Sequence, residues 1–180
     1  MVGLASVTAL QGSAGFGADK AGPSGVLFYL AGYAMTNLTA FSVIIAISNK
    51  TNSDMIDSFA GLVKKSPLMA AAMTLSMISL IGIPPTVGFM AKIYIFGAAM
   101  DTGLWWLATI GVINSVISAY YYLRVVKVMF ISEATESLPL RPDVGAASAA
   151  MVAMIATLVF GLYPAPIINF AYRAVSTIIS

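Results

Sequence analysis

Long uncharged apolar runs dominate the pattern of this chain. Residues 25–48, 102–123 and 144–163 hold no charged side chain, and residues 67–100 hold only Lys92. A helix of about 20 apolar residues crosses the hydrocarbon core of a bilayer and satisfies its own backbone hydrogen-bonding groups. The pattern therefore predicts four transmembrane spans in an all-α, polytopic transmembrane helix bundle.

The segments outside these runs are polar or short. "NKTNSDMIDSFAGLVKK" has room for a short surface helix, and "ISEATESLPLRPD" is a turn-rich connector with two prolines. The tail "IINFAYRAVSTIIS" is weakly amphipathic, so we expect it at the membrane interface. The N-terminal "MVGLASVTAL" is apolar but too short to span. We therefore expect residues 1–180 to be one partial membrane domain that begins with the end of a helix from a longer protein.

The second span, residues 67–100, is too long for one straight crossing. As a continuous helix it would run roughly 50 Å, against a hydrocarbon core of about 30 Å. The sequence "GIPPTVG" inside it predicts a break into two half-helices, residues 67–81 and 87–100.

Four residues carry this predicted break. Pro84 and Pro85 lack a backbone N–H, and Gly82 and Gly88 tolerate non-helical dihedral angles. Irregular backbone at membrane depth is found only where it is buried in protein or lines a wet cavity. Discontinuous helices of this kind mark ion or substrate sites in transporters.

Lys92 follows the break and is expected inside the hydrocarbon zone. About 13 Å of helix separates it from Asp101, the next charged residue. A charged side chain at the centre of a membrane helix costs roughly 2.5–3.5 kcal/mol, so a compensating role is expected. One interpretation is a proton-carrying amine, since desolvation disfavours its charged form. The alternative is a structural lysine that donates hydrogen bonds to carbonyls freed by the break.

Weaker candidates lie in two other spans. Asn37, in the middle of the first span, and Ser115, in the third, are candidates for a proton path. Hydrogen bonding between helices is the commoner role of such residues, and both interpretations stay open. The run Tyr120–Tyr122 and the pair Trp105 and Trp106 are typical of aromatic belts at the two membrane interfaces.

Composition and charge agree with a membrane protein. The chain is 59% hydrophobic and 9% charged, whereas a soluble domain carries about 25% charged residues. A net charge of +2 without a basic stripe gives no support for a nucleic-acid partner. There is no Cys and no His, which excludes thiol chemistry and metal sites built on these ligands within this chain.

Positive charges in the loops predict the orientation. Six lie in the loops after the first and third spans and only two on the opposite side. The positive-inside rule then places those two loops in the cytoplasm. The six are Lys50, Lys64, Lys65, Arg124, Lys127 and Arg141, and the two are Lys20 and Arg173.

Three segments resemble a known family. "LMAAAMTLSMISLIGIPPTVGFMAKIYIF" is similar to the broken twelfth helix of the antiporter-like membrane subunits of respiratory complex I. "LWWLATIGVINSVISAYYYLRVVKVMF" resembles the helix that follows it, and "LVFGLYPAPII" the end of the last helix. "YYYLR" and "YPAPI" favour the subunit N group of NADH:quinone oxidoreductase. The resemblance covers nearly the whole chain and identifies it as a C-terminal fragment.

The resemblance implies a role in redox-driven proton pumping. Lys92 matches the lysine of the family's proton channel, so this chain would contribute the distal part of that channel. The chain itself would bind no cofactor and no metal. FMN, the iron–sulfur clusters, NADH and quinone would be held by other subunits. Its partners would be other membrane subunits and the lipid bilayer, in the inner or plasma membrane.

Two other functions fit the same residues. A subunit of a multisubunit sodium/proton antiporter shares the broken helix and its lysine. A non-pumping structural membrane module would keep the helices without their transport role. The family's channel also uses a Glu and two Lys on earlier helices, which this sequence does not contain.

Overall fold

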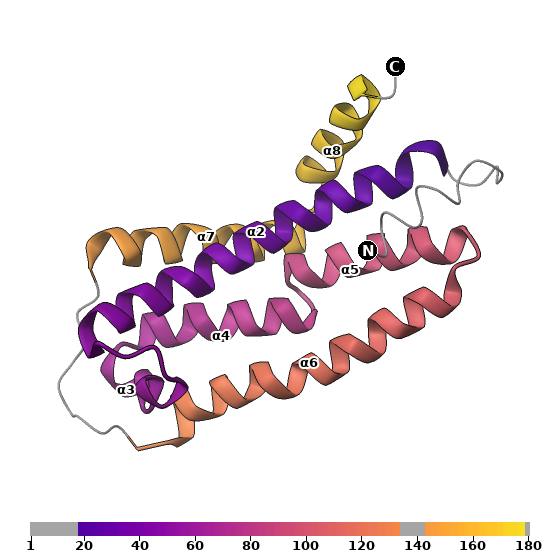
Figure 1. The fold of residues 1–180 in the computed structure, drawn as a ribbon. Coiled ribbons are helices and arrows are strands. Elements are labelled where there is room, and N and C mark those ends of the chain that lie inside the picture. Colours follow the sequence, from indigo (N-terminus) through magenta and orange to yellow (C-terminus); the bar gives the residue numbers. More distant parts are fainter. Residues whose placement is uncertain (1–17, 134–142, 179–180) are drawn as a thin grey trace.

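The computed structural model describes residues 18–133 and 143–178, and this part of the chain is built of helices and loops without strands (Figure 1). The all-α prediction is confirmed. The helices are α2 (Ala18–Thr51), the 3₁₀ helix η2 (Ile56–Phe59), α3 (Leu62–Lys65), α4 (Pro67–Ile81), α5 (Val87–Asp101), α6 (Trp105–Ile131), α7 (Val144–Leu162) and α8 (Ala165–Ile178).

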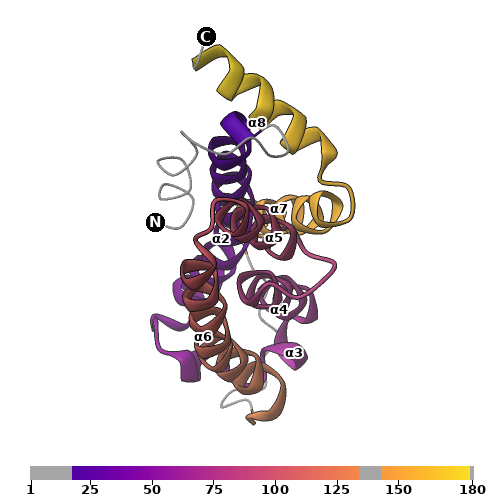
Figure 2. The same ribbon diagram turned by 90° about the vertical axis from the view of Figure 1, so that its right-hand side faces the viewer.

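The two short apolar helices α4 and α5 lie end to end through the bundle (Figure 1). α2 contacts both of them, and α7 lies beside α2. α6 runs along the other side and also contacts both. α8 packs on α2 and points away from the bundle, as Figure 2 shows. The long helices α2, α6 and α7 therefore each contact both halves of the broken helix and can hold the junction in place.

Among the described residues, three helices are long and apolar enough to cross a membrane alone, and they are α2, α6 and α7. α4 and α5 have 15 residues each, or roughly 22 Å of helix, so neither spans by itself. A fourth crossing made by the two helices together stays a prediction. The predicted break is confirmed, with half-helices at Pro67–Ile81 and Val87–Asp101.

Two of the helices extend beyond the predicted spans. α2 begins at Ala18 rather than near residue 25, and it contains Pro23. α6 continues to Ile131 rather than ending at residue 123, with Arg124 and Lys127 exposed on its last turns. Charge marks where a span leaves the hydrocarbon, but a helix continues into the interface when its charged side chains reach water. The expected helix end before α2 and part of the connector before α7 lie outside the described residues.

Local signals explain where individual helices begin. Pro67 stands at the first turn of α4, where its missing N–H costs nothing. Asp143 caps α7 by accepting a hydrogen bond from the N–H of Gly145 at 3.1 Å. The polar segment after α2 forms η2 and α3, which confirms the expected short helix there.

Lysines of the two positively charged regions lie at one end of the bundle. The N–H of Gly61 donates to the carbonyl of Val128 at 3.4 Å, which brings the α3 region against the end of α6 (Figure 1). Lys64 and Lys127 are therefore on the same side of the molecule, as the charge count requires. The assignment of that side to the cytoplasm stays a prediction.

Small residues form much of the helix contact surface. Ala70, Ala91, Ala99 and Ala150 are completely buried, as is Val43. Small side chains let helix backbones approach closely, which drives association in a bilayer where apolar burial alone gives little. α2, α4, α5 and α7 are packed in this way, and α6 leaves most of its surface exposed.

Candidate functional site

The site lies where α4 ends and α5 begins. Gly82 ends α4 in the left-handed conformation, with φ of 89°, and its N–H donates to the carbonyl of Ile78 at 3.0 Å. Glycine adopts this conformation without the steric cost that other residues meet. Pro84 and Pro85 lie exposed in the connecting turn, and α5 starts at Val87. The break thus opens the last carbonyls of α4 and the first N–H groups of α5 inside the bundle.

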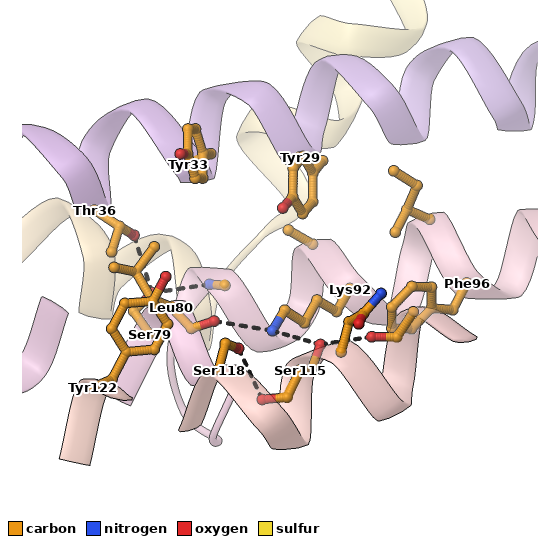
Figure 3. A pocket seen from close by; sticks show the side chains of 15 residues that line it. Tyr29, Tyr33, Thr36, Ser79, Leu80, Lys92, Phe96, Ser115, Ser118 and Tyr122 are labelled. Carbon is orange, nitrogen blue, oxygen red and sulfur yellow. Dashed lines mark hydrogen bonds between the residues drawn. The ribbon is translucent and has the colours of Figure 1, made fainter. Parts of the chain in front are cut away.

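Lys92 of α5 reaches back to the end of α4. Its Nζ donates to the carbonyls of Leu80 at 2.9 Å and Ile81 at 2.8 Å, and to Oγ of Ser115 at 3.1 Å (Figure 3). An ammonium group has three N–H donors, and here each has an uncharged acceptor. The carbonyls at a helix C-terminus also carry the negative end of its dipole. The end of α4 is therefore a cation site built from backbone.

Glycines make this approach possible. A Cβ on Gly82 would lie 2.8 Å from Cδ of Lys92, so the lysine side chain covers the glycine. A Cβ on Gly88 would overlap the backbone carbonyl of Ser79 and lie 2.8 Å from its Oγ. The two glycines predicted at the break therefore have different roles. Gly82 accommodates the Lys92 side chain, and Gly88 lets α5 contact α4.

A second polar group sits on the other side of the junction. Oγ of Ser79 in α4 accepts a hydrogen bond from the N–H of Gly88 in α5 at 3.2 Å. The same Oγ lies 3.0 Å from Oγ1 of Thr36 in α2, and both side chains are 1% exposed. One of the orphaned N–H groups of α5 is satisfied in this way.

A pocket of about 400 Å³ connects these groups between α2, α4, α5 and α6. Besides Lys92 it is lined by the hydroxyl-bearing residues Thr36, Ser79, Ser115 and Ser118 and by three tyrosines (Figure 3). The tyrosines are Tyr29, Tyr33 and Tyr122. The interrupted backbone thus borders a cavity whose largely apolar wall carries several hydroxyl groups and one amine.

The structure places one of the two predicted path residues at the site and the other outside it. It brings Ser115 to Lys92, and Ser118 donates to the carbonyl of Ser115 at 2.9 Å. Asn37 does not line the pocket, and its Nδ2 donates to the carbonyl of Tyr33 in its own helix at 2.8 Å. Thr36, one residue earlier, points to the site instead.

The tyrosines and Ser79 were missed as site residues. Tyr120 and Tyr121 are exposed, consistent with the expected aromatic belt, but Tyr122 is half-buried and lines the pocket. Successive helix residues are about 100° apart, so a run of three tyrosines must turn one of them inward. That geometric signal was present in the sequence, whereas the position of Tyr29 and Tyr33 of α2 in the same pocket was not.

No metal site is evident within residues 18–133 and 143–178, where no three acidic side chains gather closely enough to hold an ion. The polar groups of the pocket are hydroxyls, backbone carbonyls, the carboxamide of Asn114 and the amine of Lys92. Such a set suits hydrogen-bonded water and protons better than a divalent cation.

Fold and site together define a polytopic α-helical membrane protein with a broken helix and an embedded lysine. The family described as "NADH:quinone oxidoreductase/Mrp antiporter, TM" matches residues 13–118, more than half of the chain. The chain belongs to this family.

Curated relatives and solved structures agree with that assignment. NADH-quinone oxidoreductase subunit N of Desulfitobacterium hafniense is 43% identical over 99% of this chain. Subunit N 2 of Chloroherpeton thalassium is 45% identical over 89% of it. The alignments take in 37% and 32% of these relatives, so the chain spans about a third of their length.

Two solved complexes contain the same fold. A chain of respiratory complex I from Thermus thermophilus is 24% identical, with a TM-score of 0.67 over 93% of this chain and 42% of that one. A chain of the Mrp complex from Dietzia sp. is 21% identical, with a TM-score of 0.74 over 96% of this chain and 38% of that one. At these identities the likeness concerns the fold.

Proposed function

We propose that this chain forms part of a membrane subunit N of proton-pumping NADH:quinone oxidoreductase and contributes the distal part of its proton channel. The relatives that carry this name support the assignment at 43% identity over nearly the whole chain. The observation that carries the mechanism is the placement of Lys92, whose amine lies at a helix break, beside a pocket that bears several hydroxyl groups, with three hydrogen-bond acceptors.

The mechanism is electrostatic. The protonated amine of Lys92 uses three N–H groups, one for each acceptor, and the neutral amine keeps only two. Loss of the proton therefore leaves one acceptor without its donor and weakens the attraction to the end of α4. A charge that appears next to the site changes the balance between the two forms, and the proton leaves toward the far side of the membrane.

The rest of the enzyme lies in other subunits under this proposal. FMN and the iron–sulfur clusters, together with the NADH and quinone sites, belong to those subunits, and this chain moves protons without a redox centre of its own. Its partners are the other membrane subunits and the lipid of the inner or plasma membrane. The apolar, largely exposed surface of α6 fits such surroundings.

A sodium/proton antiporter subunit is the second candidate. Its support is the family description, which includes Mrp antiporters, and the Mrp chain that shares this fold. Transport that continues without NADH or quinone would favour this candidate. A non-pumping structural module is the third, and it requires that Lys92 be dispensable for transport.

The test is Lys92→Met in the assembled complex. Methionine keeps much of the volume of the side chain but removes the amine, so NADH-driven proton uptake by inverted membrane vesicles should be lost. The control is Lys127→Met, which removes an exposed lysine from the end of α6 and should pump normally. Full proton uptake by an assembled Lys92→Met complex would overturn the proposal.

A further inference from the structure

We propose that Thr36 and Ser79 form a buried clamp that joins α2 to both halves of the broken helix and positions the amine of Lys92 on the end of α4. The inference rests on the proposed function for its effect on transport, but the clamp itself is a matter of geometry. In this role Thr36 and Ser79 are positioning residues, since they act on the proton site through the backbone that holds it.

The hydrogens of the clamp have a definite order. Oγ1 of Thr36 donates to the carbonyl of Gly32 at 2.9 Å, which uses its one hydrogen. The 3.0 Å contact between the two hydroxyls is then donated by Ser79. Ser79 in turn accepts from the N–H of Gly88. A directed chain thus runs from α5 through α4 to α2, and each hydroxyl both donates and accepts.

Steric contacts hold the same three helices together. A Cβ on Gly32 would lie 3.0 Å from Cγ2 of Val87, so α2 touches the first turn of α5. Val87 is completely buried. The close approach of Gly88 in α5 to Ser79 in α4 holds the two half-helices against each other. The two half-helices therefore cannot slide past each other without breaking the hydroxyl chain or overlapping backbone atoms.

Three other buried hydroxyls make a local bond within their own helix. Those of Thr39, Ser76 and Thr157 donate to the carbonyl four residues earlier in their own helix. Thr36 makes that local bond too, and it has the contact across to Ser79 in addition. Thr157 is as deeply buried as Thr36, at 1% exposure, and it therefore provides a matched control.

The clamp and the lysine site share one turn of α4. Ser79 directly precedes Leu80 and Ile81, whose carbonyls accept from Lys92. The clamp thus fixes α5 against the same turn that Lys92 must reach. If the clamp loosens, the distance from Nζ to these carbonyls changes while the helices remain formed.

The experiment compares Thr36→Val, Thr36→Ser and Thr157→Val in the assembled complex within membrane vesicles. Valine keeps the shape of threonine and removes the hydroxyl, whereas serine keeps the hydroxyl. One readout is the rate at which the Lys92 amine is methylated by formaldehyde and cyanoborohydride, followed by mass spectrometry. The other is the number of protons taken up per NADH oxidised.

Thr36→Val should accelerate methylation of Lys92 roughly two- to tenfold, the range that corresponds to one net hydrogen bond. It should also lower the proton yield per NADH. Thr36→Ser and Thr157→Val should match the unmodified chain in both. Methylation of Thr36→Val at the rate of Thr157→Val would overturn the clamp, and faster methylation with an unchanged proton yield would overturn its role in transport.

The methylation readout separates this inference from the proposed function. It reports the position of the amine whether or not Lys92 carries a transported proton. If the Lys92→Met complex still pumped, the proposed function would fail, but the methylation rates would still test the clamp. A second variant, Thr36→Cys/Ser79→Cys, exploits the absence of cysteine from this chain. Oxidation should join the two residues, and the joined protein should methylate as slowly as the unmodified one. Failure of the two cysteines to join would contradict the contact.

Discussion

Gly82 and Lys92 occupy one shared space, since a methyl group on the glycine would lie 2.8 Å from Cδ of the lysine and 3.3 Å from its Nζ. A glycine is needed here for two reasons: it adopts a φ of 89°, and it leaves room for the Lys92 side chain that packs on it. The end of α4 and the Lys92 side chain of α5 therefore form one packed unit.

Gly82→Ala should disrupt this unit. A left-handed conformation costs a residue with a Cβ about 1–2 kcal/mol, and the Lys92 side chain must also move. We expect a less heat-stable complex with a reduced proton yield per NADH, measured by thermal inactivation and by vesicle proton uptake. Gly97→Ala in α5 is the control, because nothing lies within 4 Å of the added Cβ. Equal behaviour of the two variants would contradict this description of the junction.

Gly161 of α7 supports the break from outside. A Cβ there would lie 2.5 Å from the carbonyl carbon of Thr86 and 2.7 Å from its Cα, and Gly161 is buried. Gly161→Ala should therefore push the turn between the half-helices and lower both assembly and pumping by several-fold. Assembly can be measured as the amount of intact complex in detergent extracts. Leu162→Ala changes an exposed neighbour and should behave normally; a normal Gly161→Ala complex would show that α7 does not support the turn.

Ser115 supplies the side-chain acceptor for Lys92, whereas the other two acceptors are backbone carbonyls. Ser115→Ala leaves the two carbonyls of α4 in place and removes one bond to a charged donor, a change of about 1.5–3 kcal/mol. The rate of NADH-driven proton uptake should fall by about tenfold or more while assembly is preserved. Thr109→Val, also on α6, removes an exposed hydroxyl that donates to backbone outside the pocket and should pump normally. A fall of equal size in both variants would assign the effect to α6 rather than to Lys92.

The helix break was predictable because its causes are local. Two prolines and two glycines within a few residues interrupt any helix, and the predicted half-helices agree with α4 and α5 to within one residue. The position of Lys92 relative to the break followed directly. Its acceptors on α4 were anticipated as one of two interpretations, for the same local reason.

The partners from other helices were beyond local reasoning. The sequence places Thr36 and Asn37 at adjacent positions of an apolar span, and their side chains point about 100° apart. Which of them faces the site depends on the rotation of α2 against α4 and α5. The sequence does not fix this rotation, because α2 is apolar on both faces. Thr36 meets Ser79, and Asn37 bonds to its own helix. The same ambiguity hid Tyr122 within its run of three tyrosines.

The most direct test of the central claim is the proton yield per NADH of Lys92→Arg in the assembled complex. Arginine keeps a positive charge and several N–H donors for the carbonyls of Leu80 and Ile81, but it does not release its proton in proteins. If Lys92 carries a transported proton, the variant should assemble, oxidise NADH and show a reduced proton yield. A yield equal to that of the unmodified complex would contradict the account and assign Lys92 a purely structural role.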